Sequence, residues 1–229
     1  MATVISLGGS MINGKGKPDL AFVRRFAATV SKLRGKIAIV TGGGKVAREY
    51  ASAVAALGAS HFSADAVAVR ATRMNAHLLV AALGDKCYPR VPEDFDEATF
   101  ALNGTDYRYV VMGGTIPGIT TDTDAVLLGE AVGASRLINL SNVDGIYDSD
   151  PNKNRKAKKY GKLTHAQLVK IAQESDKREP GTHFVFDLVA CKLAMRGGVQ
   201  LHFVGGKNLA DLPKAAQGKG HRGTVVSLK

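Results

Sequence analysis

Three clusters of glycine follow short apolar stretches of this sequence, and they are the residues whose type and placement best suit chemistry. The clusters are Gly8-Gly9, Gly42-Gly43-Gly44, and Gly113-Gly114 with Gly118. Glycine lets a backbone approach a ligand closely and adopt positive φ. Where a strand leads into a helix, the first amides of that helix are also free to bind an anion. Three such clusters in one chain predict phosphate binding.

Two standard phosphate motifs fit the glycine clusters only in part. The segment from Gly9 to Lys15 fits G-x-x-x-x-G-K, but Gly16 stands where a P-loop needs Ser or Thr for Mg²⁺. It also shows no clear helix start. The segment from Gly42 to Ala47 fits G-x-G-x-x-A, and Asp65 follows about 20 residues later, as in a dinucleotide-binding fold. Because of Gly16 and the missing helix start, we reject the first motif. Because Asp65 opens an Ala-rich helical stretch instead of ending a second strand, we disfavour the second motif.

The charge of the chain narrows the class of ligand. The formal net charge is +11 and the sequence pI is about 9.7, which favours anionic partners. Aromatic residues make up only 6% and Trp is absent, so few rings are available for stacking on bases. We therefore expect small phosphorylated ligands and consider nucleic acid an unlikely partner. A basic run at 153–162 is either a solvated loop or a segment near phosphate.

The composition describes an ordinary globular chain. Its 229 residues are 45% hydrophobic and 22% charged, and no apolar run is long enough to span a membrane. Cys87 and Cys191 lie outside any metal-ligand spacing, and no secretion signal is visible, so we expect reduced thiols in a cytoplasmic protein. The six histidines are scattered, and no catalytic triad is evident.

Short apolar stretches alternate with helical patterns along the chain. Strands are expected at 3–7, 37–40, 88–91, 109–112, 137–140, 200–204 and 224–228. Helices are expected at 19–33, 45–57, 64–83 (one helix or a pair), 122–132, 164–173, 187–196 and 209–216. This alternation predicts an α/β fold with an open, mostly parallel sheet sandwiched by helices. A change of composition near 133–136 divides one compact domain into residues 1–135 and 136–229.

Several motifs occur in order and cover essentially the whole chain. They are Ser6-Leu7-Gly8-Gly9-Ser10, Gly42-Gly43-Gly44-Lys45-Val46-Ala47-Arg48, Thr72-Arg73-Met74-Asn75-Ala76, Gly113-Gly114-Thr115-Ile116-Pro117-Gly118-Ile119-Thr120-Thr121-Asp122, and Asn142-Val143-Asp144-Gly145-Ile146-Tyr147. In these motifs the chain resembles the amino acid kinase superfamily, and within it the archaeal-type uridylate (UMP) kinases. The resemblance implies transfer of the ATP γ-phosphoryl group to UMP with Mg²⁺, in pyrimidine nucleotide biosynthesis. It also implies a homohexamer built as a trimer of dimers.

The resemblance further implies where the two nucleotides bind. The acceptor UMP is assigned to residues 1–135 and ATP to residues 136–229. The residues expected to bind UMP are Gly43, Asp65, Thr115, Ile116, Pro117, Gly118, Ile119, Thr120 and Thr121. Those expected to contact ATP are Gly9, Ser10, Gly44, Arg48, Ser141, Tyr147 and Asp150. Asp144, Lys153 and Lys158 are the expected catalytic residues.

The reaction itself needs no general base, because the phosphate oxygen of a nucleoside monophosphate is already ionised. The difficulty is to bring two polyanions together, which calls for Mg²⁺, loop amides and cationic side chains. Many relatives carry a Lys where this chain has Ser6, and the replacement cation is to be sought among Lys45, Arg48, Lys153 and Lys158. Asp144 is either a turn former or the carboxylate that orients basic groups.

Several residues have two interpretations on sequence grounds. Asp65 could accept hydrogen bonds from a ribose diol or cap a helix. Thr120 and Thr121 could hold uracil and phosphate, cap a helix at Asp122, or do both. Tyr147 could pack on adenine or fill the core. Asp124 is a second acid where an apolar or small residue is expected, and we expect it to face solvent.

Two other functions remain as alternatives. One is a related phosphotransferase acting on a carboxylate, a carbamate or an isoprenoid phosphate. The other is a non-catalytic ATP-binding protein that stores an oxyanion such as molybdate.

Overall fold

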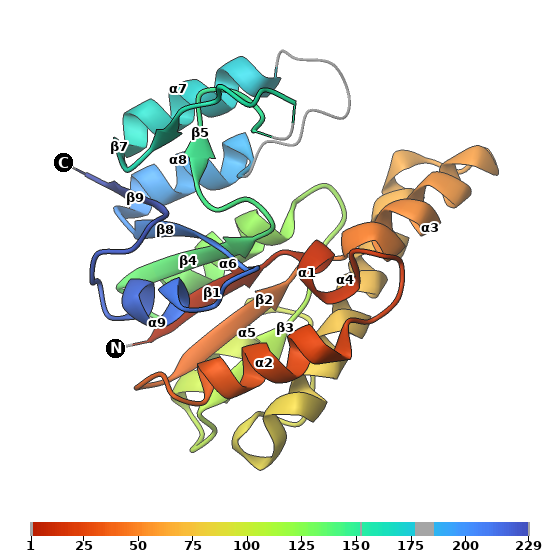
Figure 1. The fold of residues 1–229 in the computed structure, drawn as a ribbon. Coiled ribbons are helices and arrows are strands. Elements are labelled where there is room, and N and C mark those ends of the chain that lie inside the picture. Colours follow the sequence, from red (N-terminus) through yellow and green to blue (C-terminus); the bar gives the residue numbers. More distant parts are fainter. Residues whose placement is uncertain (1, 152, 177–185, 229) are drawn as a thin grey trace.

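The framework of the protein is a seven-stranded sheet with the order β3-β2-β1-β4-β8-β9-β7 (Figure 1). The computed structural model describes residues 2–151, 153–176 and 186–228. Strands β3, β2, β1, β4 and β8 are parallel, whereas β9 runs antiparallel to β8. The strands are β1 (Thr3–Leu7), β2 (Ile37–Thr41), β3 (Tyr109–Met112), β4 (Arg136–Ser141), β7 (Lys162–Thr164), β8 (Gln200–Gly205) and β9 (Thr224–Ser227), with a separate ribbon of β5 (Ile146–Tyr147) and β6 (Lys159–Tyr160). The predicted open, mostly parallel α/β sheet is confirmed.

Helices cover both faces of this sheet. One core cluster packs α5 (Phe95–Asn103), α6 (Thr121–Ala131), α7 (His165–Asp176) and α8 (Leu188–Gly197) against one face. The other cluster packs α1 (Gly9–Asn13), α2 (Leu20–Val30), α4 (His61–Leu83) and α9 (Asp211–Ala216) against the opposite face. Alternate strand residues serve the two clusters, Val4 one and Ile5 the other. Burial on both faces explains why the strands are mostly apolar.

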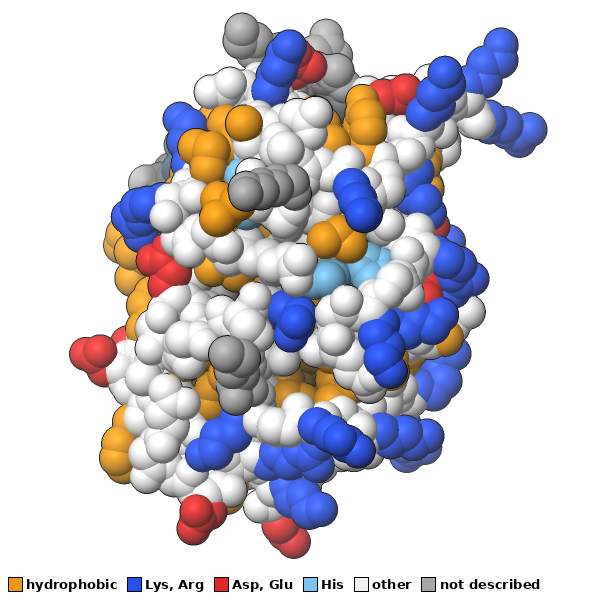
Figure 2. Space-filling view, turned by 90° about the vertical axis from the view of Figure 1, so that its left-hand side faces the viewer, with side chains coloured by type: hydrophobic (Ala, Val, Ile, Leu, Met, Phe, Trp, Pro, Cys, Tyr) orange, Lys and Arg blue, Asp and Glu red, His pale blue; other side chains and the backbone are white. Residues whose placement is uncertain are grey.

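The hairpin of α3 (Gly44–Ala56) and α4 projects from one end of the sheet (Figure 1). Helix α3 packs mainly on α4, and Ala47 is its one buried residue. The other end of the molecule is strongly basic, because Lys and Arg side chains gather over much of the face on which β9 ends (Figure 2). This surface is consistent with the net charge of +11.

The order of the strands places a crevice at the end of β1. This strand lies between β2 and β4, so that Leu7 is opposite both Thr41 and Leu140. The chain continues from β1 to β2 on one side and reaches β4 on the other, and such a switch point is where open α/β sheets bind ligands. Residues 1–135 supply β1 to β3 and residues 136–229 supply the remaining strands, so the two halves meet along the β1–β4 pair.

Three local predictions were wrong. The expected strand at 88–91 is absent, and only a single bridge joins Cys87 to Tyr109. Pro89 has no N–H to donate to a ladder, and its fixed φ suits the bend that follows. Helix α5, which begins after its cap Asp94, was not anticipated. Helix α1 begins directly at Gly9, where no helix start was recognised.

Two further expectations concern the whole chain. Cys87 and Cys191 are both buried and are not joined in a disulfide. No helix within the ranges that the structure describes is long and apolar enough to cross a membrane.

Two of the six histidines form a pair between β8 and the turn before β9, in which His202 is buried and His221 is half-buried. The backbone N–H of Gly223 donates to Nδ1 of His221 (3.1 Å), so the proton of His221 is on Nε2 and points to Nδ1 of His202 (2.9 Å). His202 then donates from Nε2 to the side-chain oxygen of Gln200 (3.1 Å). This chain of bonds requires both rings to be neutral. Burial, with His221 and Arg136 nearby, lowers the pKa of His202 to about 4.

The neutral His202 makes stability depend on pH. In the unfolded chain the pKa of His is about 6.5, so its contribution is complete above pH 6.5 and is lost as pH falls from 6.5 to 4. We expect the unfolding free energy, measured by urea denaturation at pH 7 and pH 5, to fall about 2 kcal/mol less in His202→Gln than in the wild type. The exposed His77 offers a matched control, His77→Gln, which should behave as the wild type does. Identical losses in His202→Gln and wild type would contradict this account.

Candidate functional site

A cavity of about 440 Å³ lies at the carboxyl ends of β1, β2 and β4. It is therefore in the crevice that the strand order creates. Its walls come from both halves of the chain: Ser6, Gly8, Gly9, Ser10, Gly42, Gly43, Gly44, Arg48, Thr121, Asp122, Asn139, Ser141, Asn142, Val143, Ile146, Tyr147, Asp148, Ser149, Asp150, Pro151, Tyr160, Ile171 and Glu174.

Two glycine loops touch each other at the floor of this cavity. A Cβ added to Gly9 would lie 2.2 Å from the backbone nitrogen of Gly44 and 2.4 Å from the carbonyl oxygen of Gly42. Gly44 itself has φ of +66°, and a Cβ there would lie 2.1 Å from Oδ1 of Asn13. Only glycine allows backbone to pack on backbone this closely.

Two buried asparagines hold the second glycine loop from behind. Asn75 donates from Nδ2 to the carbonyl of Gly42 (2.8 Å), and Asn13 donates from Nδ2 to the carbonyl of Gly43 (3.1 Å) and to Oδ1 of Asn75 (3.0 Å). Oδ1 of Asn13 in turn accepts the backbone N–H of Lys45 (3.1 Å). The loop carbonyls thus accept hydrogen bonds from the protein. An incoming anion, which is also an acceptor, does not have to compete with these carbonyls for donors.

The two helices that begin at the glycine loops are preceded by residues without a capping side chain, and among the first amides of α3 only that of Lys45 is described as bonded to a side chain, that of Asn13. Gly8 and Gly43 precede α1 and α3 without a capping hydrogen bond. In contrast, Asp19, Asp94 and Asp187 cap α2, α5 and α8. The first amides of a helix have no partners within it. Two uncapped N-termini on one cavity therefore form a site suited to a polyanion.

A carboxylate also lies on the cavity wall. Oδ1 of Asp122 accepts hydrogen bonds from Oγ of Ser6 (2.6 Å) and Nδ2 of Asn139 (2.9 Å). Burial raises the pKa of Asp122 to about 7, and the nearby Asp187 acts in the same direction against the two hydrogen bonds. A carboxyl group beside an anion site is suited to binding a cation that accompanies the anion.

Sequence reasoning missed this group, although a signal was present. Ser6 and Asn139 are polar residues in otherwise apolar, buried strands, and they lie opposite each other in the β1–β4 register. The motif comparison draws attention to Ser6 because a Lys is missing there. It gives no indication of a role for Asn139 on β4 or for Asp122, which binds both residues.

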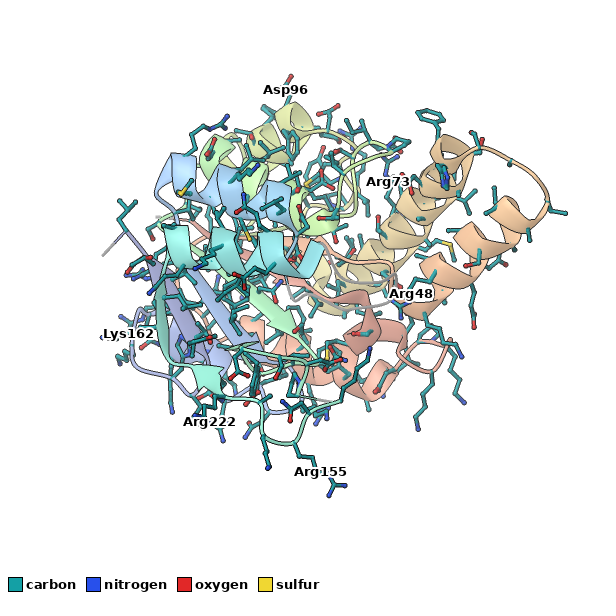
Figure 3. All side chains as sticks on the ribbon, turned by 90° about the horizontal axis from the view of Figure 1, so that it is seen from above. Arg48, Arg73, Asp96, Arg155, Lys162 and Arg222 are labelled. Carbon is teal, nitrogen blue, oxygen red and sulfur yellow. The ribbon has the colours of Figure 1, made fainter. Side chains whose placement is uncertain are left out.

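Arg48 supplies positive charge at the edge of the cavity. It is the one Lys or Arg among the described residues that line the cavity, and it follows Gly44 by one turn of α3. Its side chain is exposed, and Figure 3 shows it at the base of the α3–α4 hairpin.

A second cavity of about 390 Å³ lies across the loop that joins β4 to β5. Asp144 lines it and accepts hydrogen bonds from Nζ of Lys159 (2.8 Å) and the hydroxyl of Tyr147 (2.6 Å). Although burial opposes them, these donors hold the pKa of Asp144 below its usual value. Asp144 therefore does orient a basic group, and that group is Lys159.

The structure brings together nine of the expected nucleotide-binding residues. Gly9, Ser10, Gly43, Gly44, Arg48, Thr121, Ser141, Tyr147 and Asp150 all line the first cavity. Lys153 and Lys158 are exposed and line neither cavity. Arg155, in the same basic run, points away from the body of the molecule (Figure 3). For most of this run, the solvated interpretation agrees with the structure.

The remaining expected residues form a separate group beside the cavity. Asp65 accepts a hydrogen bond from the backbone N–H of Gly118 (3.1 Å), in the loop of residues 115–120. Asp65 lies within α4, whose cap is Ser60, so its interpretation as a helix cap was wrong. Thr120 does cap α6, by accepting the N–H of Thr123 (3.2 Å).

The prediction that Asp124 faces solvent was wrong. Its exposed fraction is 0%, and it accepts hydrogen bonds from both the hydroxyl and the N–H of Thr115. The sequence pattern could not reveal these donors because they come from the preceding loop and not from the helix.

Comparisons with known proteins show which family and fold this chain shares. The model of the amino acid kinase family matches residues 1–205. The chain is 41% identical to a uridylate kinase of Thermococcus onnurineus over 228 residues, which cover 99% of both chains. A crystal structure of uridylate kinase from Archaeoglobus fulgidus matches with a TM-score of 0.87 at 39% identity, covering 99% of this chain and 100% of that one. A UMP kinase from Bacillus anthracis, at 20% identity and a TM-score of 0.81, shares the fold.

The contact between the glycine loops predicts the effect of one added methyl group. In Gly9→Ala the new Cβ meets backbone atoms, which cannot swing away as a side chain could. We expect the unfolding free energy to fall by about 3 kcal/mol. We also expect calorimetry to detect no binding of inorganic tripolyphosphate to this variant. A Cβ at Gly220 has no atom within 4 Å, so Gly220→Ala is the control. Tripolyphosphate affinity equal to that of the wild type in Gly9→Ala would contradict the assigned site.

Proposed function

The chain belongs to the amino acid kinase family, and from this premise we propose that it is a uridylate kinase, which transfers the γ-phosphoryl group of ATP to UMP and releases UDP and ADP. The observation that carries the proposal is similarity along the whole chain to curated uridylate kinases, 41% identical in Thermococcus onnurineus and 40% in Archaeoglobus fulgidus. The cavity described above supports it, because two uncapped helix N-termini on touching glycine loops suit a polyphosphate.

We assign the donor nucleotide to the first cavity. The phosphates of ATP would lie against the amides that follow Gly8 and Gly43, with Arg48 balancing their charge. The adenosine would extend toward Tyr147 and Asp150, which line the same cavity. The half of the chain at 136–229 would thus hold the nucleoside, while the glycine loops of residues 1–135 hold its phosphates.

The residues present fit a magnesium ion that arrives with ATP. Mg²⁺ is usually held by one or two carboxylates together with substrate phosphates and water. Asp122 offers such a carboxylate, since Ser6 and Asn139 bond only its Oδ1. When bound, Mg²⁺ would neutralise charge on the donor phosphates. Its presence would also favour the ionised form of Asp122.

The acceptor would bind beside the donor, along the loop of residues 115–121. Asp65 and the loop amides lie together there, and Thr121 at its end lines the donor cavity. A ribose diol could donate to the Asp65 carboxylate, and the loop can supply neutral donors to uracil and phosphate. An ionised phosphate oxygen of UMP then attacks the γ-phosphorus without a general base. The protein's part is to position both anions and to stabilise the charge between them.

Lys159 is the cation that we propose to act in place of the Lys missing at Ser6. Its ammonium is fixed by Asp144, on the loop that separates the two cavities, whereas Lys153 and Lys158 are solvent-exposed. We also propose, from the family resemblance, that the active form is a cytoplasmic hexamer.

The reaction is tested with purified protein, Mg·ATP and each of UMP, CMP, AMP and GMP, by following ADP release and identifying the product. We expect UDP from UMP at a rate well above that with the other acceptors. Tight ATP binding without turnover of any nucleotide would contradict a kinase, and stoichiometric uptake of an oxyanion would then indicate storage.

The role of Asp122 is tested by Asp122→Asn, which keeps the acceptor for Ser6 and Asn139 but removes the charge. We expect kcat to fall at least about 100-fold, the usual scale for one electrostatic group. Because burial raises the pKa of Asp122 to about 7, from about 3.9 in an unfolded chain, this carboxyl lowers stability progressively as pH rises from about 4 to 7, and the loss is complete at pH 8. The unfolding temperature of Asp122→Asn at pH 8 should therefore equal or exceed that of the wild type. Asp96→Asn, at an exposed site, is the control; unchanged kcat in Asp122→Asn would refute the role.

A further inference from the structure

Asp124 is a fully buried carboxylate that the mechanism above does not use. It is two residues beyond Asp122 on α6, but it lies outside the lining of the first cavity. Oδ1 accepts the hydroxyl of Thr115 (2.6 Å) and Oδ2 accepts the N–H of Thr115 (3.3 Å). Its two oxygens are thus directed at one residue, at the start of the loop assigned to the acceptor.

Helix α4 binds the same stretch of loop from the other side. Oγ1 of Thr72 accepts the N–H of Gly114 (2.7 Å). Arg73 donates from Nε to the carbonyl of Gly114 (3.1 Å) and from Nη2 to the carbonyl of Thr115 (3.0 Å). Its Nη1 forms an ion pair with Glu93.

Every backbone polar group of Gly114 and Thr115 is therefore bonded to a side chain. Both N–H groups and both carbonyls find partners on α4 or α6, although neither residue belongs to a strand or helix. Backbone groups normally find such partners within secondary structure. Here the local shape of the chain is imposed by Thr72, Arg73 and Asp124.

The kind of side chain at this position bears on its role. Asp124 has an exposed fraction of 0%, and both of its oxygens accept hydrogen bonds from Thr115. A buried carboxylate is costly, and an apolar residue of similar size is often as stable or more so. What the carboxylate supplies is direction, since it accepts two donors at fixed positions.

The loop is also held at Gly118, while Ile116, between Thr115 and Gly118, is exposed. The N–H of Gly118 donates to Asp65, whereas the side chain of Ile116 is 58% exposed. Because the loop is fixed at Thr115 and at Gly118 and is exposed between them, it presents its amides and hydroxyls in one geometry. Such preorganisation lowers the cost of binding a ligand.

We propose that Asp124, acting with Arg73, is a positioning residue that sets the shape of the acceptor loop and so determines affinity for the nucleoside monophosphate. This inference rests on the proposed function, because it takes the loop of residues 115–121 as the acceptor site. Asp124 acts through Thr115 and does not itself touch the donor cavity.

The first test is steady-state kinetics of Asp124→Asn. An amide has one acceptor oxygen where the carboxylate has two, and its NH₂ would oppose a donor of Thr115. We expect the KM for UMP to rise about tenfold, the equivalent of one hydrogen bond of about 1.4 kcal/mol, with the KM for ATP and kcat within about twofold of wild type. Asp96→Asn, at an exposed site, should change none of these values.

Thr115→Val gives a milder second variant, because it removes only the hydroxyl donor. If Asp124 acts through Thr115, Thr115→Val and Asp124→Asn combined should raise the KM for UMP less than the product of their single effects. If the two single effects on the KM for UMP multiply in the double variant, the proposed route of action is wrong. The proposal is also wrong if Asp124→Asn folds with a lower melting temperature but keeps the wild-type KM for UMP.

Hydrogen exchange of the loop amides separates this inference from the proposed function. In the absence of nucleotide, the amides at 115–121 should exchange faster in Asp124→Asn than in wild type and Asp96→Asn. If the wild type does not use UMP but this difference is present, the proposed function fails while the positioning role stands. Equal exchange in all three proteins would refute the positioning role, whatever the activity.

Discussion

The close contact between two glycine loops is the constraint on which the rest of the site depends. Gly9 packs directly on Gly42 and Gly44, with no room for a side chain between them. The contact follows from the parallel pairing of β1 with β2, which ends both strands at one level. It brings the N-termini of α1 and α3 to one cavity, and the two asparagines beneath fix the loop carbonyls. Positive potential is thus built from backbone amides, which explains how the cavity can suit a polyanion with a single arginine among its described lining residues.

Much of this site could be predicted from the sequence because its parts are local. A run of apolar residues followed by glycine marks the end of a buried strand, and the alternation with helices fixes a parallel sheet whose strand ends share one edge. This pattern locates the glycine loops, and the family resemblance supplied the other expected residues, of which nine in all line one cavity. The Asp122 group could not be found in this way. It needs the register that puts Ser6 opposite Asn139, and this register joins strands about 130 residues apart in the sequence.

The errors have the same origin. Asp124 was placed in solvent because acids on helices usually are exposed, whereas the loop before the helix supplies two donors to it. The ion pair of Lys159 with Asp144 was also not foreseen, since nothing in a basic run shows which of its side chains meets an acid. Local propensity describes single elements. The charged contacts that connect loops to other elements depend on tertiary structure, and in this protein they hold the loop of residues 115–120 and pair Lys159 with Asp144.

The central claim is that the donor phosphates lie against the amides of the touching glycine loops. A crystal structure with UMP and a non-hydrolysable ATP analogue with Mg²⁺ tests it most directly. The account predicts phosphate oxygens within hydrogen-bond distance of the first amides of α1 and α3, with the metal beside Asp122 and the uridine on the loop of residues 115–121. A triphosphate seated instead in the second cavity, against Lys207 and Arg222, would contradict it.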